Sequence, residues 1–153
     1  MKYIILENIR SAYNVGAIFR TADGAGVSKI FLIGYTPAPI DRFGRPQPEI
    51  KKTSLGASET IVWEHCTDVA SVIEKLQAEG VLVVAVEQTP TAVSLTNLSV
   101  PDSVAYIVGN EVDGVSEITL SAVDKVVEIP MFGSKESLNV SVAAGIVLYH
   151  GLV

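Results

Sequence analysis

Short apolar runs alternate with amphipathic stretches along the whole chain. Six runs rich in branched side chains are predicted to be strands: residues 3–6, 29–33, 61–63, 81–86, 104–108 and 126–129. Apolar residues that recur every three or four positions predict helices at about 14–24, 68–78, 116–122 and 137–150. Strands that alternate with helices predict a three-layer α/β domain with a mostly parallel sheet.

Two polar stretches interrupt this pattern. Residues 35–56 hold four prolines and much of the positive charge, which predicts a long excursion with little regular structure. Residues 87–102 hold two more prolines and are predicted to be a second loop. Long loops in compact domains often carry function.

Glycines and polar side chains gather where the later strands end. One strand stops before Gly109, the next stops before Pro130, and the last helix is predicted to start at Ser137. Because open α/β sheets bind ligands at the carboxyl ends of their strands, we expect the site within about 106–141.

The composition fits one domain over residues 1–153, with no internal repeat or linker. The chain is 48% apolar and 18% charged, which is outside the range of disordered chains. No apolar run approaches the ~20 residues that span a bilayer, and the first apolar run is too short for a signal peptide. The single Cys66 excludes an internal disulfide and suits a reducing, cytoplasmic location.

The charge is unevenly distributed. The formal net charge of −6 by itself argues against a nucleic-acid partner. Residues 1–60, however, hold eight Lys and Arg against five acidic residues, or +3, whereas residues 61–153 hold three against twelve, or −9. An anionic partner is therefore expected to meet the N-terminal part, although a solvated basic surface also explains these charges.

The first candidate constellation is Asn14-x-Gly16-x-x-x-Arg20. Asn14 is predicted to cap a helix, and Gly16 and Arg20 then share a helix face away from the apolar stripe. The absent side chain at Gly16 is expected to leave room for a ligand beside the guanidinium, which is well suited to phosphate. A surface arginine on a capped helix also explains this pattern taken alone.

The second constellation is Gly109-Asn110-Glu111-x-x-Gly114, directly after a predicted strand. Its glycines are expected to let backbone groups approach a ligand closely, with Glu111 at the mouth of the site. An ordinary strand-to-helix turn with an acidic helix start is the alternative. The pattern is not a dinucleotide-binding fingerprint, which needs three glycines early in the chain.

The third constellation joins the segments Ile129-Pro130-Met131 and Ser137-Leu138-Asn139. Ser137 is predicted to cap the last helix, and Asn139, at the second helical position, is predicted to face a ligand. Met131 and Leu138 offer an apolar floor suited to an aromatic base. A turn and a cap would account for the same residues.

In this order and spacing, the three constellations closely resemble the motifs of the SpoU (TrmH-like) family of RNA ribose 2′-O-methyltransferases, in the SPOUT superfamily. The resemblance covers essentially the whole chain. It implies a SPOUT-type α/β knot, in which the segment of about 104–153 forms a deep trefoil knot that the general rules of chain topology do not predict. The implied enzyme uses S-adenosylmethionine to methylate a ribose 2′-hydroxyl in RNA.

The resemblance also assigns residues to the cofactor and to a second subunit. Family members are typically homodimers in which the arginine of the first motif reaches toward the partner's cofactor, and Arg20 matches it. The apolar stripe of the last helix then packs on the sheet or on the other subunit. The implied cofactor contacts are Val86, Glu87, Gly109, Asn110, Glu111, Gly114, Ile129, Met131, Ser137 and Leu138.

Methyl transfer to a hydroxyl is an in-line displacement that needs no metal, and we expect no metal site. Arg20 keeps its proton at ordinary pH, so it is expected to bind a phosphate and stabilise developing negative charge. Asn14, Ser137 and Asn139 are expected to orient the ribose, and Glu111 to help shape the site. The residues expected to contact RNA are Arg10, Arg20, Arg42, Arg45, Lys51 and Lys52.

The sequence specifies the RNA less tightly. Few residues precede the first motif or follow the third, and family members often use extensions there to grip structured RNA. We expect a tRNA rather than a ribosomal RNA, because a minimal dimer offers a small footprint. The alternatives are a ribosomal RNA 2′-O-methyltransferase, a base-methylating SPOUT enzyme and a non-catalytic module that binds cofactor or RNA.

Overall fold

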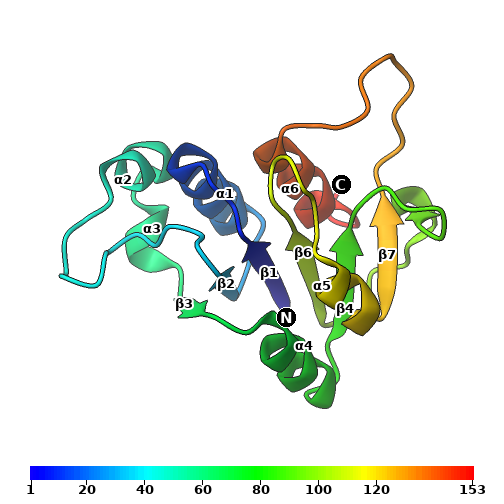
Figure 1. Cartoon of the computed structure of the whole chain (residues 1–153), viewed down its shortest axis with the longest axis horizontal. Helices are drawn as coiled ribbons and strands as arrows, with labels where there is room; N and C mark the ends of the chain where they lie inside the picture. The colour runs from blue at the N-terminus through cyan, green and yellow to red at the C-terminus, as the bar shows by residue number, and fades with distance from the viewer.

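The computed structural model describes residues 1–153 and is built around a seven-stranded sheet (Figure 1). The strands are β1 Lys2–Glu7, β2 Lys29–Ile33, β3 Trp63–Cys66, β4 Leu82–Val86, β5 Val93–Ser94, β6 Val104–Val108 and β7 Lys125–Glu128. They lie in the order β3-β2-β1-β6-β4-β7-β5, and every pair of neighbours is parallel. The predicted mostly parallel α/β sheet is confirmed.

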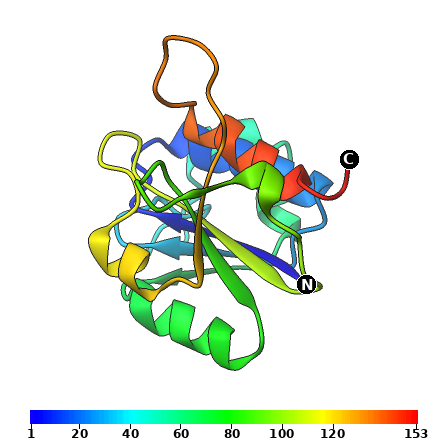
Figure 2. The same ribbon diagram turned by 90° about the vertical axis from the view of Figure 1, so that its right-hand side faces the viewer.

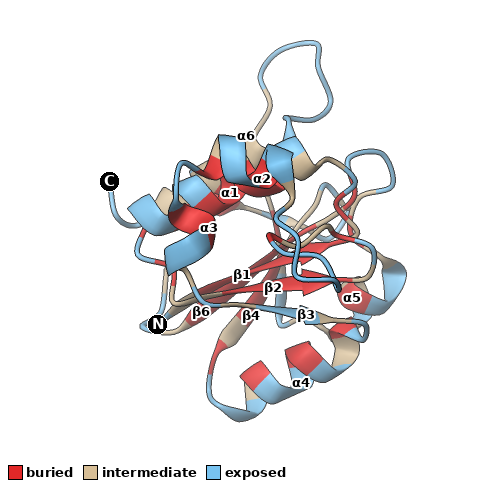
Figure 3. Cartoon of the chain, turned by 90° about the vertical axis from the view of Figure 1, so that its left-hand side faces the viewer, coloured by how far each residue is buried: buried red, intermediate tan, exposed pale blue.

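Helices cover both faces of this sheet. The helices are α1 Ala12–Gly24, α2 Pro48–Ser54, α3 Ala57–Thr60, α4 Val69–Ala78, α5 Glu117–Ala122 and α6 Val140–Tyr149, with a 3₁₀ turn at Leu95–Asn97. Figures 2 and 3 show α1, α2, α3 and α6 on one face and α4 and α5 on the other, which gives the predicted three layers. None of the helices combines the length and apolar character that a bilayer-spanning segment requires.

The central strands are buried from both sides. In β1, Ile4 and Leu6 face the core beneath α1 and α6, whereas Ile5 faces the core beneath α4. Successive side chains of a strand point to opposite faces, so a strand covered on both faces must be apolar throughout. This explains why β1, β4 and β6 read as continuous apolar runs.

Two predicted helix starts are wrong, by three residues for α1 and by two for α6. The N-cap of α1 is Ser11, whose hydroxyl accepts the Asn14 backbone N–H at 3.1 Å. The N-cap of α6 is Asn139, whose side chain accepts the Ser141 N–H at 2.8 Å, so Ser137 lies before the helix. Apolar spacing locates a helix but does not choose among several polar residues that could cap it.

The predicted loops also hold short elements. The stretch 35–56 contains α2, which begins with Pro48 after its cap Gln47 and buries Ile50. The stretch 87–102 contains β5 and the 3₁₀ turn, and β3 begins at Trp63 rather than at residue 61. Elements this short carry too few apolar residues to produce a period.

The outer face of α6 is apolar and open. The residues of α6 that reach the core are Val140, Ala144, Val147 and Leu148. Leu138, Val142 and Ile146, on the predicted stripe, are instead 36%, 50% and 40% exposed. Within one chain these three side chains are therefore left open, whereas Tyr149, the fourth residue of the predicted stripe, packs against the core.

Candidate functional site

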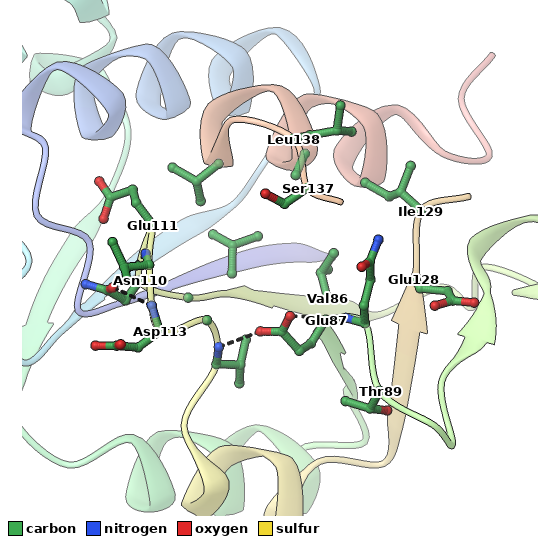
Figure 4. A pocket seen from close by; sticks show the side chains of 18 of the residues that line it. Val86, Glu87, Thr89, Asn110, Glu111, Asp113, Glu128, Ile129, Ser137 and Leu138 are labelled. Atoms are coloured by element: carbon green, nitrogen blue, oxygen red, sulfur yellow. Dashed lines mark hydrogen bonds between the residues drawn. The ribbon is translucent and has the colours of Figure 1, made fainter. Parts of the chain in front are cut away.

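A pocket of about 520 Å³ opens at the carboxyl ends of the neighbouring strands β6, β4 and β7. The residues leading into α6 form its remaining wall (Figure 4). Its volume lies in the usual range for small-molecule and cofactor sites. Because the strand ends and the start of α6 come from four separate segments, only the folded chain assembles this cavity.

All ten residues predicted as cofactor contacts line this pocket. Of the predicted catalytic residues, Glu111, Ser137 and Asn139 also line it, whereas Asn14 and Arg20 do not. Sequence reasoning missed several lining residues beside the motifs: Gln88, Thr89, Asp113, Glu117, Leu120, Glu128, Val140 and Ala143. Glu128 lies within the last predicted strand and Gln88 two residues beyond the strand predicted at 81–86, so their position near these strand ends was the available signal.

The loop after β6 is closed by its own hydrogen bonds. Asn110 and Gly114 exchange two backbone hydrogen bonds, of 3.1 and 2.9 Å. The Asn110 side chain accepts the N–H groups of Val112 and Asp113, both at 2.8 Å, and donates to the carbonyl of Asn8 at 2.9 Å and to the hydroxyl of Tyr35 at 2.8 Å. Asn110 therefore lines the pocket while its side chain holds the loop together.

The two glycines of this loop are required by the chain's own packing. A Cβ on Gly109 would lie 2.4 Å from the carbonyl carbon of Gly114, and Gly114 has a φ of +72°. A Cβ on Gly114 would also lie 2.0 Å from the Glu87 carboxylate. Both glycines line the pocket, as predicted, and the structure adds that the folding of the loop itself also requires them.

Glu87 fastens the end of β4 to this loop. Its Oε2 accepts the Val115 N–H at 2.8 Å, and its Oε1 accepts the Gln88 N–H at 3.1 Å. Hydrogen bonds from backbone N–H groups to a carboxylate are stronger than those between neutral groups. Glu87 therefore positions two strand ends that form the pocket.

A line of hydrogen bonds joins the three sequence motifs. The Glu111 carboxylate accepts the backbone N–H groups of Arg10 at 2.9 Å and Ser11 at 3.0 Å, and the Asn14 amide at 3.4 Å. Asn14, which is buried, in turn accepts the Asn139 amide at 3.4 Å. Glu111 thus connects the loop after β6 to the start of α1, and Asn14 connects α1 to the cap of α6.

The same contacts change the acidity of Glu111. Partial burial opposes ionisation, but the N–H donors of Arg10 and Ser11 outweigh it and hold the pKa of this carboxyl below its usual value. At neutral pH Glu111 is therefore an anion that anchors the backbone at Arg10 and Ser11.

Gly16 serves a different purpose from the one predicted. A Cβ there would lie 1.8 Å from the Thr53 hydroxyl and 2.9 Å from the Ile50 carbonyl oxygen, both on α2. The missing side chain lets α2 pack closely against α1 and leaves no room for a ligand. The predicted space beside Arg20 is therefore wrong.

The predicted basic residues are exposed, and they lie outside the pocket. Arg20 lies on the exposed side of α1 and makes no ion pair. Lys51 and Lys52 lie in the last turn of α2, while Arg42 and Arg45 belong to the loop before it. These positions agree with the predicted basic N-terminal surface but do not bring Arg20 to its own pocket.

The pocket itself is acidic. Its lining has no Lys or Arg but includes five carboxylates: Glu87, Glu111, Asp113, Glu117 and Glu128. Figure 4 shows Glu111 and Asp113 on the opposite side of the pocket from Glu128. No three His, Cys, Asp or Glu side chains converge as a metal site would require. This electrostatic environment suits a cationic ligand.

The model of the SpoU rRNA Methylase family matches residues 1–149. The chain belongs to this family. One relative, the 23S rRNA (guanosine-2′-O-)-methyltransferase RlmB of Neisseria meningitidis serogroup B, is 36% identical over 145 residues, which are 95% of this chain and 55% of that protein. The chain thus spans little more than half the length of this curated relative.

Several solved structures share the fold. The AdoMet-bound rRNA methyltransferase of Sinorhizobium meliloti superposes with a TM-score of 0.87 at 29% identity, covering 97% of this chain and 54% of that one. The TrmH/SpoU tRNA modifying enzyme of A. aeolicus gives 0.85 at 26% identity, covering 97% and 72%. A structure described for the 2-OH methylation of C/U34 on tRNA gives 0.83 at 25% identity, covering 99% and 94%.

Proposed function

We propose that this chain is an S-adenosylmethionine-dependent methyltransferase that acts on a ribose 2′-hydroxyl of RNA. The observation that carries the proposal is the pocket, because all ten motif residues matched to cofactor contacts line one cavity at the strand ends. Its five carboxylates suit a cationic sulfonium, and Ile129, Met131 and Leu138 offer apolar surface to an adenine ring. The family membership of the chain supports the same assignment.

When bound, S-adenosylmethionine supplies an electrophilic methyl group. The ribose oxygen must approach that carbon in line while its proton is lost, so the protein contributes chiefly by holding the ribose in near-attack geometry. We assign Arg20 to a neighbouring RNA phosphate and to the developing alkoxide, because a guanidinium is a fixed cation with planar donors.

We assign Asn14 and Asn139 to positioning rather than to direct contact with the ribose. Asn139 caps α6 through Ser141 and donates to Asn14, which also bonds to Glu111. These bonds, with that from the Ser141 hydroxyl, use three of the four hydrogen-bonding positions of the Asn139 amide and two of the four of Asn14. Ser137 makes no hydrogen bond to protein through its side chain and remains the candidate to contact the ribose.

We also propose that the enzyme is a homodimer in which Arg20 completes the partner's pocket. Two observations support this: Arg20 lies outside its own pocket, and the outer stripe of α6, including Val142 and Ile146, is apolar and exposed beside α1. Exposed apolar patches of this kind mark association surfaces.

A complementation assay tests the shared site. Arg20→Ala is expected to abolish methylation while leaving cofactor binding intact, and Leu138→Asp is expected to abolish cofactor binding. Mixing the two inactive variants should restore about a quarter of wild-type activity, because half of randomly mixed C2 dimers are heterodimers with one intact site. No recovery in heterodimers isolated with two affinity tags would contradict the shared site.

A deep trefoil knot over about 104–153 belongs to the same proposal. The chain leaves β7, which lies next to the edge strand β5, and returns to place α6 beside α1 (Figure 1). Helix α1 follows β1, which lies near the middle of the sheet. Stretching the chain by its two termini in a single-molecule force experiment tests the knot. The contour length of the unfolded chain should fall short of the fully extended length if a knot tightens, and should reach it if there is no knot.

Methylation assays decide the substrate and separate the proposal from its alternatives. We propose a cytoplasmic enzyme and test tRNA first; ribosomal RNA is the second substrate, and the named relatives include enzymes of both kinds. The protein is incubated with labelled S-adenosylmethionine and either RNA, followed by nucleoside mapping. A 2′-O-methylated nucleoside supports the proposal, a methylated base indicates a base methyltransferase, and cofactor binding without incorporation into either RNA indicates a non-catalytic module.

A further inference from the structure

The long loop between β2 and α2 has a small, ordered tip at residues 41–45. The Asp41 carboxylate accepts the N–H groups of Phe43 at 2.8 Å and Arg45 at 2.9 Å. The Asp41 backbone N–H donates to the Arg45 carbonyl at 2.9 Å, and the Gly44 N–H donates to the Asp41 carbonyl at 3.0 Å. The tip is therefore held in shape by its own hydrogen bonds.

This tip presents an aromatic ring beside two cationic groups. Phe43 is 67% exposed and belongs to neither apolar core. The guanidinium carbons of Arg42 and Arg45 lie 4.8 and 4.9 Å from the centre of its ring, within cation–π range. With this much of its side chain exposed beside two cations, Phe43 offers a ring on which a nucleotide base can stack.

The two arginines are not equivalent. Arg45 forms an ion pair with Asp41 at 2.9 Å, which offsets part of its charge and fixes its position. Arg42 has no carboxylate within ion-pair distance. Arg42 is therefore free to meet an external anion, and the exposed Lys51 and Lys52 follow on α2, which is joined to the loop by the Gln47 N–H to Pro39 carbonyl bond of 2.9 Å.

The geometry points to a binding site for an unpaired nucleotide of the RNA, in which Phe43 stacks on the base and Arg42 holds the adjoining phosphate. Aromatic rings beside basic side chains are the general means of binding single-stranded nucleic acid, because every base has a stacking face. A base paired in a duplex does not offer that face. This inference rests on the proposed function and extends it by naming the structural state of the RNA and the surface that reads it.

The site is separate from the methylation pocket of the same chain. In Figure 1 the loop lies beyond α2 and α3 at the β3 side of the sheet, whereas the pocket lies at the ends of β6, β4 and β7. The stacked nucleotide is therefore distinct from the one that is methylated in this chain's pocket. Removing the stacking contact with Phe43 should weaken RNA binding and raise the KM for RNA, while kcat at saturating RNA changes little.

Direct binding provides the first test. The probes are a labelled single-stranded oligouridine of about 12 nucleotides and a duplex of equal length, a size within the span of single-strand binding sites. Phe43→Ala is expected to weaken binding of the single strand about 5- to 150-fold, and Phe43→Trp to restore it. Arg42→Gln should reduce the salt dependence of binding by about one phosphate contact. Lys75→Ala, on α4 across the sheet, is the control and should bind as wild type.

Crosslinking locates the contact. Oligouridine carrying 5-iodouridine is irradiated with the full-length protein, and the joined peptide is identified by mass spectrometry. Crosslinking at Phe43 supports the inference. Unchanged affinity of Phe43→Ala for the single strand, or equal loss for the duplex, would overturn it.

The methylation assay distinguishes this inference from the proposed function. If wild type methylates RNA and Phe43→Ala shows the same KM for that RNA, the nucleotide site is wrong and the enzyme assignment stands. If wild type binds the single strand through Phe43 but transfers no methyl group to any RNA, the enzyme assignment fails and the nucleotide site stands.

Discussion

Replacing Gly109 by alanine tests whether the loop after β6 shapes the pocket. A methyl group there would lie 2.4 Å from both the carbonyl carbon and oxygen of Gly114, and 2.5 Å from the Val115 nitrogen. All three atoms are backbone, so no flexible side chain can move aside. The loop must shift by about 1 Å to reach ordinary contact distance, and this breaks the paired hydrogen bonds between Asn110 and Gly114.

The magnitude follows from these two effects. Overpacking and the loss of two backbone hydrogen bonds together are expected to lower the free energy of unfolding by about 2–4 kcal/mol. Because residues 109–115 line the pocket, affinity for S-adenosylmethionine should also fall, by at least about tenfold if 1.4 kcal/mol of contact is lost.

Urea denaturation measures the first quantity, and calorimetric titration of the folded variant measures the second. Gly133→Ala is the matched control, since a Cβ at that position meets no atom within 4 Å. If Gly109→Ala unfolds and binds the cofactor as wild type does, the loop does not have the rigid role argued here.

Three further substitutions probe the supports of the site. Tyr106 is fully buried and its hydroxyl has no partner, so Tyr106→Phe should raise the free energy of unfolding by about 1 kcal/mol in urea titrations; a loss would indicate a missed hydrogen bond. The pKa of Glu111 is lower in the folded than in the unfolded chain. Its ionised carboxylate therefore stabilises the fold at pH values above the pKa of the unfolded chain, and this stabilisation is lost as the pH falls through the pKa of the folded chain. The stability difference between wild type and Glu111→Gln should therefore be present at pH 7 and shrink toward zero below 4.5, and a difference independent of pH would contradict the charge-based anchor. Gly16→Ala should destabilise the protein by about 1–3 kcal/mol in thermal and urea unfolding, and adding Thr53→Ala should recover part of the loss, because the new methyl group meets both Thr53 and the Ile50 backbone.

The sequence was most informative where chemistry is repeated or periodic. Continuous branched runs predicted β1, β4 and β6, since a strand covered on both faces cannot carry polar residues. Asp68 and Ser116 cap α4 and α5 at the predicted starts, because each is a good capping residue directly before its helix. The motif glycines and polar residues after Val108 predicted a site at the strand ends, and these residues line one pocket there.

Other features depended on contacts between distant segments. The role of Gly16 is set by α2, which follows it by more than thirty residues. The bonds from Glu111 to Arg10 and Ser11 join positions about a hundred residues apart, and local spacing contains no information about them. The short α2 and β5 are stabilised by packing and pairing with the rest of the fold, not by a period of their own.

The sequence by itself determined the class of fold, the family and the motif residues of the pocket, because these follow from local periods and from motif order. Only the tertiary structure decided which residue caps α1 and α6, why the glycines are required, and that Arg20 lies outside the pocket of its own chain. The physical reason is that hydrogen-bond partners and steric limits are set by three-dimensional proximity, which brings together strand ends far apart along the chain.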